Sequence, residues 1–206
     1  MITGEFETHL TLTPDDADSV AGWARRRGLK YTHIVLARGR QASQPMLSWN
    51  AAGTFTEQRA AAEAVAGELR AAGFTPVRVK IEAAPWADGV PSTDPDARLL
   101  GPEHYFEHHV KVLLDGDREA LVRAVAGHRA HVSWNARRVE SDGRRQQFVT
   151  QRCHGVGLHT AGARLERLTA ALTAAGFPPL SVEREYVVHD SNLAVDDGWI
   201  EEEPTP

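Results

Sequence analysis

The sequence predicts an α+β protein that is built from two tandem copies of one unit, each with the element order β-α-β-β-α-β. Two repeated segments are the main evidence. FETHLTL at residues 6–12 returns as FEHHVKV at residues 106–112. LRAAGFTPVRVKIE at residues 69–82 returns as LTAAGFPPLSVERE at residues 172–185. Because repeated segments in a fixed order indicate an internal duplication, the same unit is expected twice.

The first unit is expected to contain four strands and two helices. The strands are expected at residues 5–12, 31–38, 45–50 and 77–82, and the helices at residues 15–27 and 56–73. Asp15, Asp16 and Asp18 favour a helix start, because acidic side chains complement the positive end of the helix dipole. Thr56 is expected to cap the second helix. The glycine and proline of AAGF-x-P are expected to end it.

The second unit repeats this order from residue 105 onward, and the element order of both units is typical of the ferredoxin-like fold. The expected divisions are repeat 1 at residues 1–84, a linker at 85–104, repeat 2 at 105–189 and an acidic C-terminal tail at 190–206. The residues expected at equivalent positions are Met46 with Phe148, Ser48 with Thr150, Val79 with Val182, Glu82 with Glu185 and, at an offset of 98 residues, His33 with His131.

Helices on one face of each sheet leave the other face open, and alternation along the strands predicts which side chains lie there. Phe6, Leu10 and Leu12 are expected to face the helices. The residues expected on the open faces are Glu7, His9, Thr11, His33, Val35, Arg78, Lys80 and Glu82 in the first unit, and Glu107, His109, Lys111, His131, Ser133, Asn135, Arg137, Ser181, Glu183 and Glu185 in the second. Because duplicated histidines are unusual on a solvated sheet, the two antiparallel sheets are expected to turn these polar faces toward a shared cleft. A solvated face that carries ion pairs is the alternative.

The composition is that of an ordinary globular protein. The 206 residues are 42% hydrophobic and 25% charged, with a net charge of −5. This charge gives no global attraction to nucleic acid or to membranes, so neither partner is expected. The single cysteine, Cys153, excludes an intramolecular disulfide. No secretory signal or apolar spanning segment is evident, and a cytoplasmic protein is expected.

Two short motifs give the polar faces a first chemical interpretation. HLTL carries His9 and Thr11, and HVSW carries His131 and Ser133. These H-x-[ST] motifs in a duplicated α+β chain resemble those of the two-histidine phosphoesterases. The resemblance implies that His9 and His131 act as general base and acid, while Thr11 and Ser133 hold the phosphate. Imidazole suits both roles because it titrates near neutral pH.

The expected activity is therefore that of a metal-independent hydrolase with histidine acid–base chemistry. Its expected ligand is a small anionic molecule, such as a nucleotide or another phosphoester, and no cofactor is expected. The candidate catalytic residues are His9, His33, His109 and His131, and the candidate substrate-binding residues are Glu7, Thr11, Lys80, Glu107, Lys111, Ser133, Arg137 and Arg152.

Three other interpretations stay open. Facing ferredoxin-like sheets also resemble a fused form of the dimeric α+β barrel superfamily. That resemblance implies a cofactor-free isomerase, cyclase or lyase, in which interior His or Glu side chains transfer protons. A non-catalytic protein that binds a ligand in the cleft is the second interpretation. The third is a metal held by the E-x-H pairs, because imidazole and carboxylate are metal ligands, but it is not favoured.

Two further segments carry polar groups near the expected cleft. In RCHGVG at residues 152–157, Arg152 lies beside two glycines that precede a helix, where backbone N–H groups can hold an anion. Glycines that serve only the backbone geometry are the more common case. The stretch at residues 190–197 is rich in Asp and Asn and follows the last strand. It suits a lid over the cleft, with a solvated tail as the default.

Overall fold

Strands and helices follow one another along the chain in the expected order. This computed structural model describes residues 1–14, 17–114, 117–139 and 145–199. The first unit comprises β1 (Thr3–Leu12), α1 (Ala17–Arg26), β2 (Lys30–Leu36), β3 (Ser43–Thr54), α2 (Phe55–Ala71) and β4 (Pro76–Ala83). The second unit comprises β5 (Tyr105–Leu114), α4 (Arg118–Val125), β6 (Ala130–Val139), β7 (Arg145–His154), α5 (Leu158–Ala174) and β8 (Ser181–Asp190). Helix α3 (Asp94–Leu100) lies between the units, and the short 3-10 helices η2 (Ala126–His128) and η3 (Leu193–Asp196) precede β6 and follow β8.

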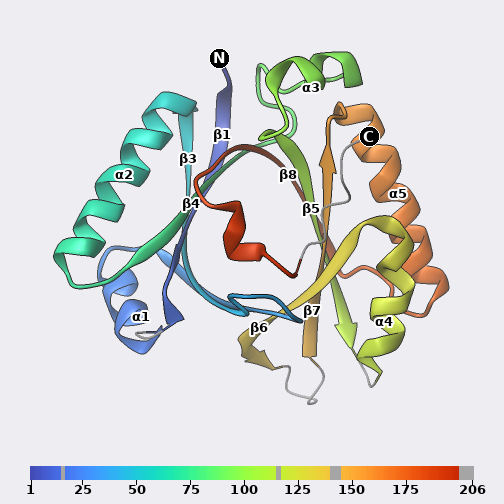
Figure 1. Cartoon of the computed structure of the whole chain (residues 1–206), viewed down its shortest axis with the longest axis horizontal. Helices are drawn as coiled ribbons and strands as arrows, with labels where there is room; N and C mark the ends of the chain where they lie inside the picture. Colours follow the sequence, from blue (N-terminus) through green and yellow to red (C-terminus); the bar gives the residue numbers. More distant parts are fainter. Residues whose placement is uncertain (15–16, 115–116, 140–144, 200–206) are drawn as a thin grey trace.

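The strands form one antiparallel sheet that closes into a barrel, in the order β1-β3-β2-β6-β7-β5-β8-β4 (Figure 1). Two seams join the units, because β2 pairs with β6 and β4 pairs with β8. The expected pair of sheets across a cleft is therefore a single barrel. Pairing between the units satisfies the backbone groups that open sheet edges would leave exposed. The shared cleft becomes the interior of this barrel.

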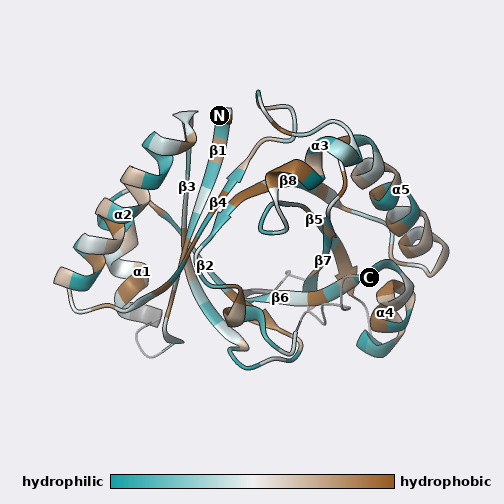
Figure 2. Cartoon of the chain, turned by 45° about the horizontal axis from the view of Figure 1, so that its top comes forward, coloured by the Kyte–Doolittle hydropathy of each residue, from teal (hydrophilic) through white to brown (hydrophobic). Residues whose placement is uncertain are grey.

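The helices cover the outside of the barrel, with α1 and α2 on one side and α4 and α5 on the other (Figure 1). Figure 2 shows hydrophilic and hydrophobic residues mixed along the strands, as strands with one polar and one apolar face require. Phe6, Leu10 and Leu12 were predicted to face the helices, and each is at most 2% exposed in the apolar clusters of the first unit. The alternation predicted for β1 is therefore confirmed.

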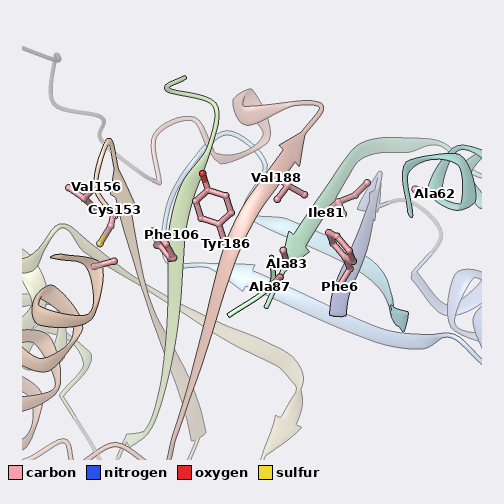
Figure 3. Packing of buried hydrophobic residues seen from close by; sticks show 11 residues of the cluster. Phe6, Ala62, Ile81, Ala83, Ala87, Phe106, Cys153, Val156, Tyr186 and Val188 are labelled. Carbon is pink, nitrogen blue, oxygen red and sulfur yellow. The ribbon is translucent and has the colours of Figure 1, made fainter. Parts of the chain in front are cut away.

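One apolar cluster crosses the seam between β4 and β8 (Figure 3). It joins Phe6 and Ile81 of the first unit to Phe106 and Tyr186 of the second. The ring centroids of Phe106 and Tyr186 are 4.7 Å apart, within the range that aromatic pairs favour. Apolar burial therefore ties the two units together on the outer side of this seam.

The strand registers define which positions of the two units are equivalent. His9 lies opposite Ser48, and His109 lies opposite Thr150. Ser48 and Thr150 are therefore equivalent, as predicted. The same comparison confirms the pairs Met46 with Phe148, Val79 with Val182, and Glu82 with Glu185.

The predicted equivalence of His33 and His131 is wrong. Lys30 lies opposite Ser48 on β3, and His131 lies opposite Thr150 on β7. His131 is therefore equivalent to Lys30, three residues before His33. An odd shift along a strand exchanges its two faces, because successive side chains point to opposite sides.

His33 and Val35 consequently point out of the barrel, while Thr32 and Ile34 line its interior. On the outer side, His33 Nε2 lies 2.8 Å from Ser43 Oγ. The prediction that His33 faces the shared cleft is therefore wrong, because its side chain lies on the outside of the barrel.

Helix α2 begins earlier than expected, and Thr54 rather than Thr56 caps it. The backbone N–H of Glu57 donates to Thr54 Oγ1 (3.3 Å), and the backbone N–H of Thr54 donates to Glu57 Oε2 (2.8 Å). This reciprocal pair is a capping box, which satisfies backbone donors at the start of the helix. Thr56 lies within the first turn and is exposed.

The segments expected as linker and tail carry structure. The linker contains α3, where the backbone N–H of Asp96 donates to Thr93 Oγ1 at the N-cap. The segment expected as a tail from residue 190 starts within β8 and continues into η3, which Figure 1 shows across the barrel opening. Within the described ranges, no helix has the length and apolar character that a membrane crossing needs.

Replacing the N-cap of α2 tests the corrected helix boundary. We expect Thr54→Ala to lower the free energy of unfolding by about 1 kcal/mol, because it removes the side-chain acceptor at the helix start. The matched change Thr56→Ala removes no cap and should leave the stability of the protein unaltered. Denaturant unfolding of both variants measures the difference. Equal losses would contradict the assignment of Thr54 as the cap.

Candidate functional site

The barrel encloses a cavity of about 330 Å³. Side chains from both units line it, and their inward direction follows from the alternation along the strands. Of the candidate residues, those that line the cavity are Glu7, His9, Thr11, Lys80, Glu107, His109, Lys111, Ser133 and Arg152. The strands thus bring most of the predicted polar residues to one enclosed space, of a size that suits a small molecule.

His9 on β1 is held from both ring nitrogens. Its Nδ1 lies 2.6 Å from Ser48 Oγ, and its Nε2 lies 2.7 Å from Glu82 Oε2. Burial by itself would lower the pKa of His9, but the negative charges of Glu82, Glu185 and Glu7 together raise it above the ordinary value. The structure therefore favours the charged imidazolium form of His9.

His109 on β5 has the same arrangement in the second unit. Its Nδ1 lies 3.0 Å from Thr150 Oγ1, and its Nε2 lies 3.1 Å from Glu107 Oε1 and 3.3 Å from Glu185 Oε2. Burial opposes the charged form here too, but contacts with Glu107 and Glu185 raise the pKa of His109 well above the ordinary value.

The two histidines form equivalent sets of three residues. His9 with Ser48 and Glu82 matches His109 with Thr150 and Glu185, because the members occupy equivalent register positions. In each set the hydroxyl fixes the ring through Nδ1 and leaves Nε2 directed at carboxylates. Burial and the nearby charge of Glu82 raise the pKa of Glu185. Two imidazole–carboxylate pairs thus lie at the cavity, where His9, His109 and Glu185 line it and Glu82 is buried against His9.

A chain of buried ion pairs connects these sets to the rest of the barrel. Lys80 Nζ lies 2.5 Å from both Glu82 Oε1 and Glu107 Oε1. Arg152 Nε donates to Glu107 Oε2 (2.6 Å), and Arg152 Nη2 donates to Asp196 Oδ2 (2.6 Å). All of these side chains are at most 8% exposed. Each charge therefore depends on its neighbours, because an unpaired ion in such surroundings is strongly unfavourable.

The C-terminal segment contributes to the cavity wall. Arg78 Nη1 donates to Asp196 Oδ2 (3.0 Å), and Arg78 also contacts Asp190. The indole N–H of Trp199 donates to the backbone carbonyl of Val132 (3.1 Å). The default expectation of a solvated tail is wrong for this segment, since Asp196 is 3% and Trp199 5% exposed. The aspartates of residues 190–197 indicated in the sequence that this segment is functional or structured. Their arginine partners lie far away in the chain and could not be identified.

Of the residues in the two H-x-[ST] motifs, His9 lines the cavity, whereas His131 is not among the described residues that line it. Thr11 and Ser133 both line the cavity. His131, however, packs against Trp199, with ring centroids 5.9 Å apart, whereas His9 contacts Ser48 and Glu82. The side chain of Arg137 lies outside the described residues, so its predicted role stays a prediction.

Two overlapping groups in the cavity have the donor types that a metal ion needs. Glu7, His9 and Glu185 form one, and Glu82, His109 and Glu185 form the other, with the ligand atoms of each group within 4.8 Å of one another. Both carboxylate oxygens of Glu82 are buried without a well-directed hydrogen bond, although Lys80 and His9 nitrogens lie close. Imidazole and carboxylate together suit Zn, Mn or Fe.

No protein-family model matches the chain, and no curated protein matches it. Among solved structures, the chain is similar to the small subunit of acetolactate synthase from Thermotoga maritima, with 15% identity over 89% of this chain and 94% of that one and a TM-score of 0.29. It is also similar to the regulatory subunit of aspartate kinase from Thermus thermophilus, with 16% identity over 84% and 93% and a TM-score of 0.30.

A third similar structure is chlorite dismutase from Candidatus Nitrospira defluvii, with 11% identity over 91% of this chain and 92% of that one and a TM-score of 0.29. All three likenesses have TM-scores of 0.30 or less. At such identities and TM-scores they support no statement about activity, substrate or cofactor.

Neutralising one buried carboxylate tests the ion-pair chain. We expect Glu82→Gln to lower the free energy of unfolding by about 3 kcal/mol, because Lys80 and His9 lose a buried countercharge. The control Glu63→Gln removes an exposed partner of Arg59 on α2 and should leave stability unaltered. Denaturant unfolding at neutral pH gives both values. A Glu82→Gln protein as stable as the control would contradict the coupling.

Proposed function

We propose that the protein is an enzyme that performs acid–base chemistry on a small anionic molecule held inside the barrel. The observation that carries the proposal is the pair of equivalent imidazole–carboxylate sets, His9 with Glu82 and His109 with Glu185, at one cavity. Buried imidazole–carboxylate pairs are unusual on a sheet face. Ionisable groups with perturbed pKa values concentrate at functional sites.

The anion is proposed to bind at Lys111. Its side chain lines the cavity, and it forms no ion pair with any residue in the described part of the chain. Its Nζ lies 5.5 Å from the ring centroid of Phe148, which gives the charge a weak partner that a substrate anion can supplement. Lys30 lines the same cavity, with its Nζ 3.8 Å from Glu7 Oε1.

The reaction we favour is the relocation of a proton, as in an isomerase, cyclase or lyase. A charged imidazolium can donate a proton or stabilise developing negative charge, and a neighbouring carboxylate can accept one. Two such sets at one cavity supply both steps to one substrate. Phosphoester hydrolysis by His9 and His131 is less supported, because His131 is not among the described residues that line the cavity.

The equivalent registers of the two units also support an origin by duplication of one βαββαβ unit. We infer that an ancestral unit paired with a copy of itself across both seams, since β2–β6 and β4–β8 join equivalent strands. Fusion of the copies would then let each half of the cavity change separately.

A divalent cation in the same cluster is a second candidate function. The buried oxygens of Glu82 that lack a well-directed hydrogen bond favour it. In this case His9 and His109 would serve as ligands through Nε2, and Ser48 and Thr150 would fix the rings from behind, as outer partners of metal-bound histidines do.

Turnover of a library of small carboxylates and phosphate esters in heavy water tests the proposal. Nuclear magnetic resonance would follow deuterium that enters C–H positions, which reports proton relocation, and free phosphate, which reports hydrolysis. We expect His9→Gln and His109→Gln each to lower turnover by at least about 100-fold. The matched control His33→Gln, on the outer face, should keep full activity.

A chelator separates the two candidates. Activity that survives chelation supports proton transfer by the side chains, and activity that returns only with an added divalent metal supports the cation site. Full turnover in the His9 and His109 variants would contradict both. Ligand binding without any turnover would contradict the enzyme proposal and leave a binding protein.

A further inference from the structure

A second pocket lies on the outer surface of the barrel, on the opposite face of β7 from the cavity. Its volume is about 260 Å³, close to that of small-ligand sites. Thr150 and Arg152 of β7 line the barrel cavity, whereas Gln151 and Cys153 line this pocket, which Arg152 also borders. The pocket lies on the other face of β7, so binding of a ligand there does not depend on the proposed enzymatic function, although Arg152 borders both sites.

Basic side chains dominate the pocket. Arg129, which follows η2, and Arg164 and Arg167 of α5 line it, and no acidic side chain does so within the described ranges. Arg164 and Arg167 form no ion pair with any described residue. The charge of Arg164 helps to lower the pKa of Asp94, but the two side chains form no ion pair. Among the described residues, the lining of the pocket is therefore basic and contains no acidic side chain.

Three arginines from two elements line this one pocket, and their charges act on the same buried thiol. Burial raises the pKa of the Cys153 thiol, and the positive charges of Arg164, Arg129 and Arg167 each act on that thiol in the opposite direction. Cys153 is 0% exposed, whereas Arg129 and Arg167 are exposed, so a dissolved anion can reach these arginines from solvent.

Arg129 has a backbone conformation that an arginine seldom adopts. Its φ is 52°, and it is the non-glycine residue with positive φ in the described part of the chain. The equivalent position of the first unit is Gly28, with φ 69°. The turn is therefore the same in both units, but the second unit places a charged side chain where glycine would be less strained.

The rest of the basic cluster is also confined to the second unit. Helices α2 and α5 align through their shared AAGF ends, which makes Ala61 equivalent to Arg164 and Ala64 equivalent to Arg167. The first unit thus has Gly and Ala where the second has arginines. A feature of the fold alone would occur in both units, so the cluster is specific to this pocket.

We propose that this pocket binds the phosphate group of a small phosphomonoester or inorganic phosphate. Guanidinium groups present paired N–H donors that match phosphate oxygens, and several of them neutralise a dianion. The amide of Gln151 is fixed at the edge, because its Nε2 donates to the backbone carbonyl of His128 (2.8 Å). The volume leaves room beyond the phosphate for a small organic group.

Titration of the full-length, ¹⁵N-labelled protein with inorganic phosphate and with glycerol phosphate tests the site. We expect saturable shifts of the amide signals of Arg129, Cys153 and Arg164. The double variant Arg164→Ala/Arg167→Ala should bind at least about tenfold more weakly, because two charge-assisted contacts are lost. Tighter binding of glycerol phosphate than of phosphate would identify a phosphomonoester as the ligand, and the reverse would identify the free ion.

Three controls keep the outcome decisive. Arg59→Ala removes an exposed arginine from α2 and should bind as the wild-type protein does. Lys111→Ala alters the barrel cavity, so shifts that persist at Arg129 in this variant exclude binding there. Arg164→Lys/Arg167→Lys keeps the charge if the alanine variant does not fold, and should still bind more weakly. Undiminished shifts in either double variant, or shifts confined to the barrel residues, would overturn the proposal.

Discussion

Buried charges inside the closed barrel must neutralise one another, and most of the structure depends on this constraint. Once β2–β6 and β4–β8 pair, the polar faces of both units meet inside one barrel, where Lys80, Glu82 and Glu107 are at most 8% exposed. Lys80 lies between Glu82 and Glu107 and forms an ion pair with both, so one cation neutralises a carboxylate from each unit. An isolated buried ion costs several kcal/mol, so the barrel can close only if these ion pairs form.

The two units share one plan but differ where charge balance and binding are at stake. Lys80 of the first unit is equivalent to Glu183 of the second, and Thr11 is equivalent to Lys111. Lys80 therefore takes part in the buried ion pairs, whereas Lys111 lines the cavity outside them. The histidine sets occur in both units, whereas the basic residues around them differ. Such divergence gives a symmetric barrel two unlike halves of a single cavity.

Local alternation in the sequence was enough to predict the inner and outer faces of β1, β4, β5 and β8. The prediction of faces failed at β2. The segment before this strand has little sequence similarity to its counterpart in the second unit, so the two strands were aligned three residues out of register, and an odd shift exchanges the two faces of a strand. His33 was misplaced for this reason. Closure into a barrel was only one of the open interpretations, because edge pairing between the units depends on long-range contacts that local alternation does not reveal. The partners of Asp196 were hidden likewise, since Arg78 lies 118 residues earlier.

The position of η3 has a consequence for how the protein reaches its final form. Asp196 is among the last described residues, yet it bonds to Arg78 and Arg152 and closes part of the cavity wall. A ribosome releases this segment after both units have emerged and can already pair. Until then the two arginines face a hydrated and incomplete interior. Contacts of such long sequence separation form slowly, so the interior is completed as a late event in the maturation of the chain.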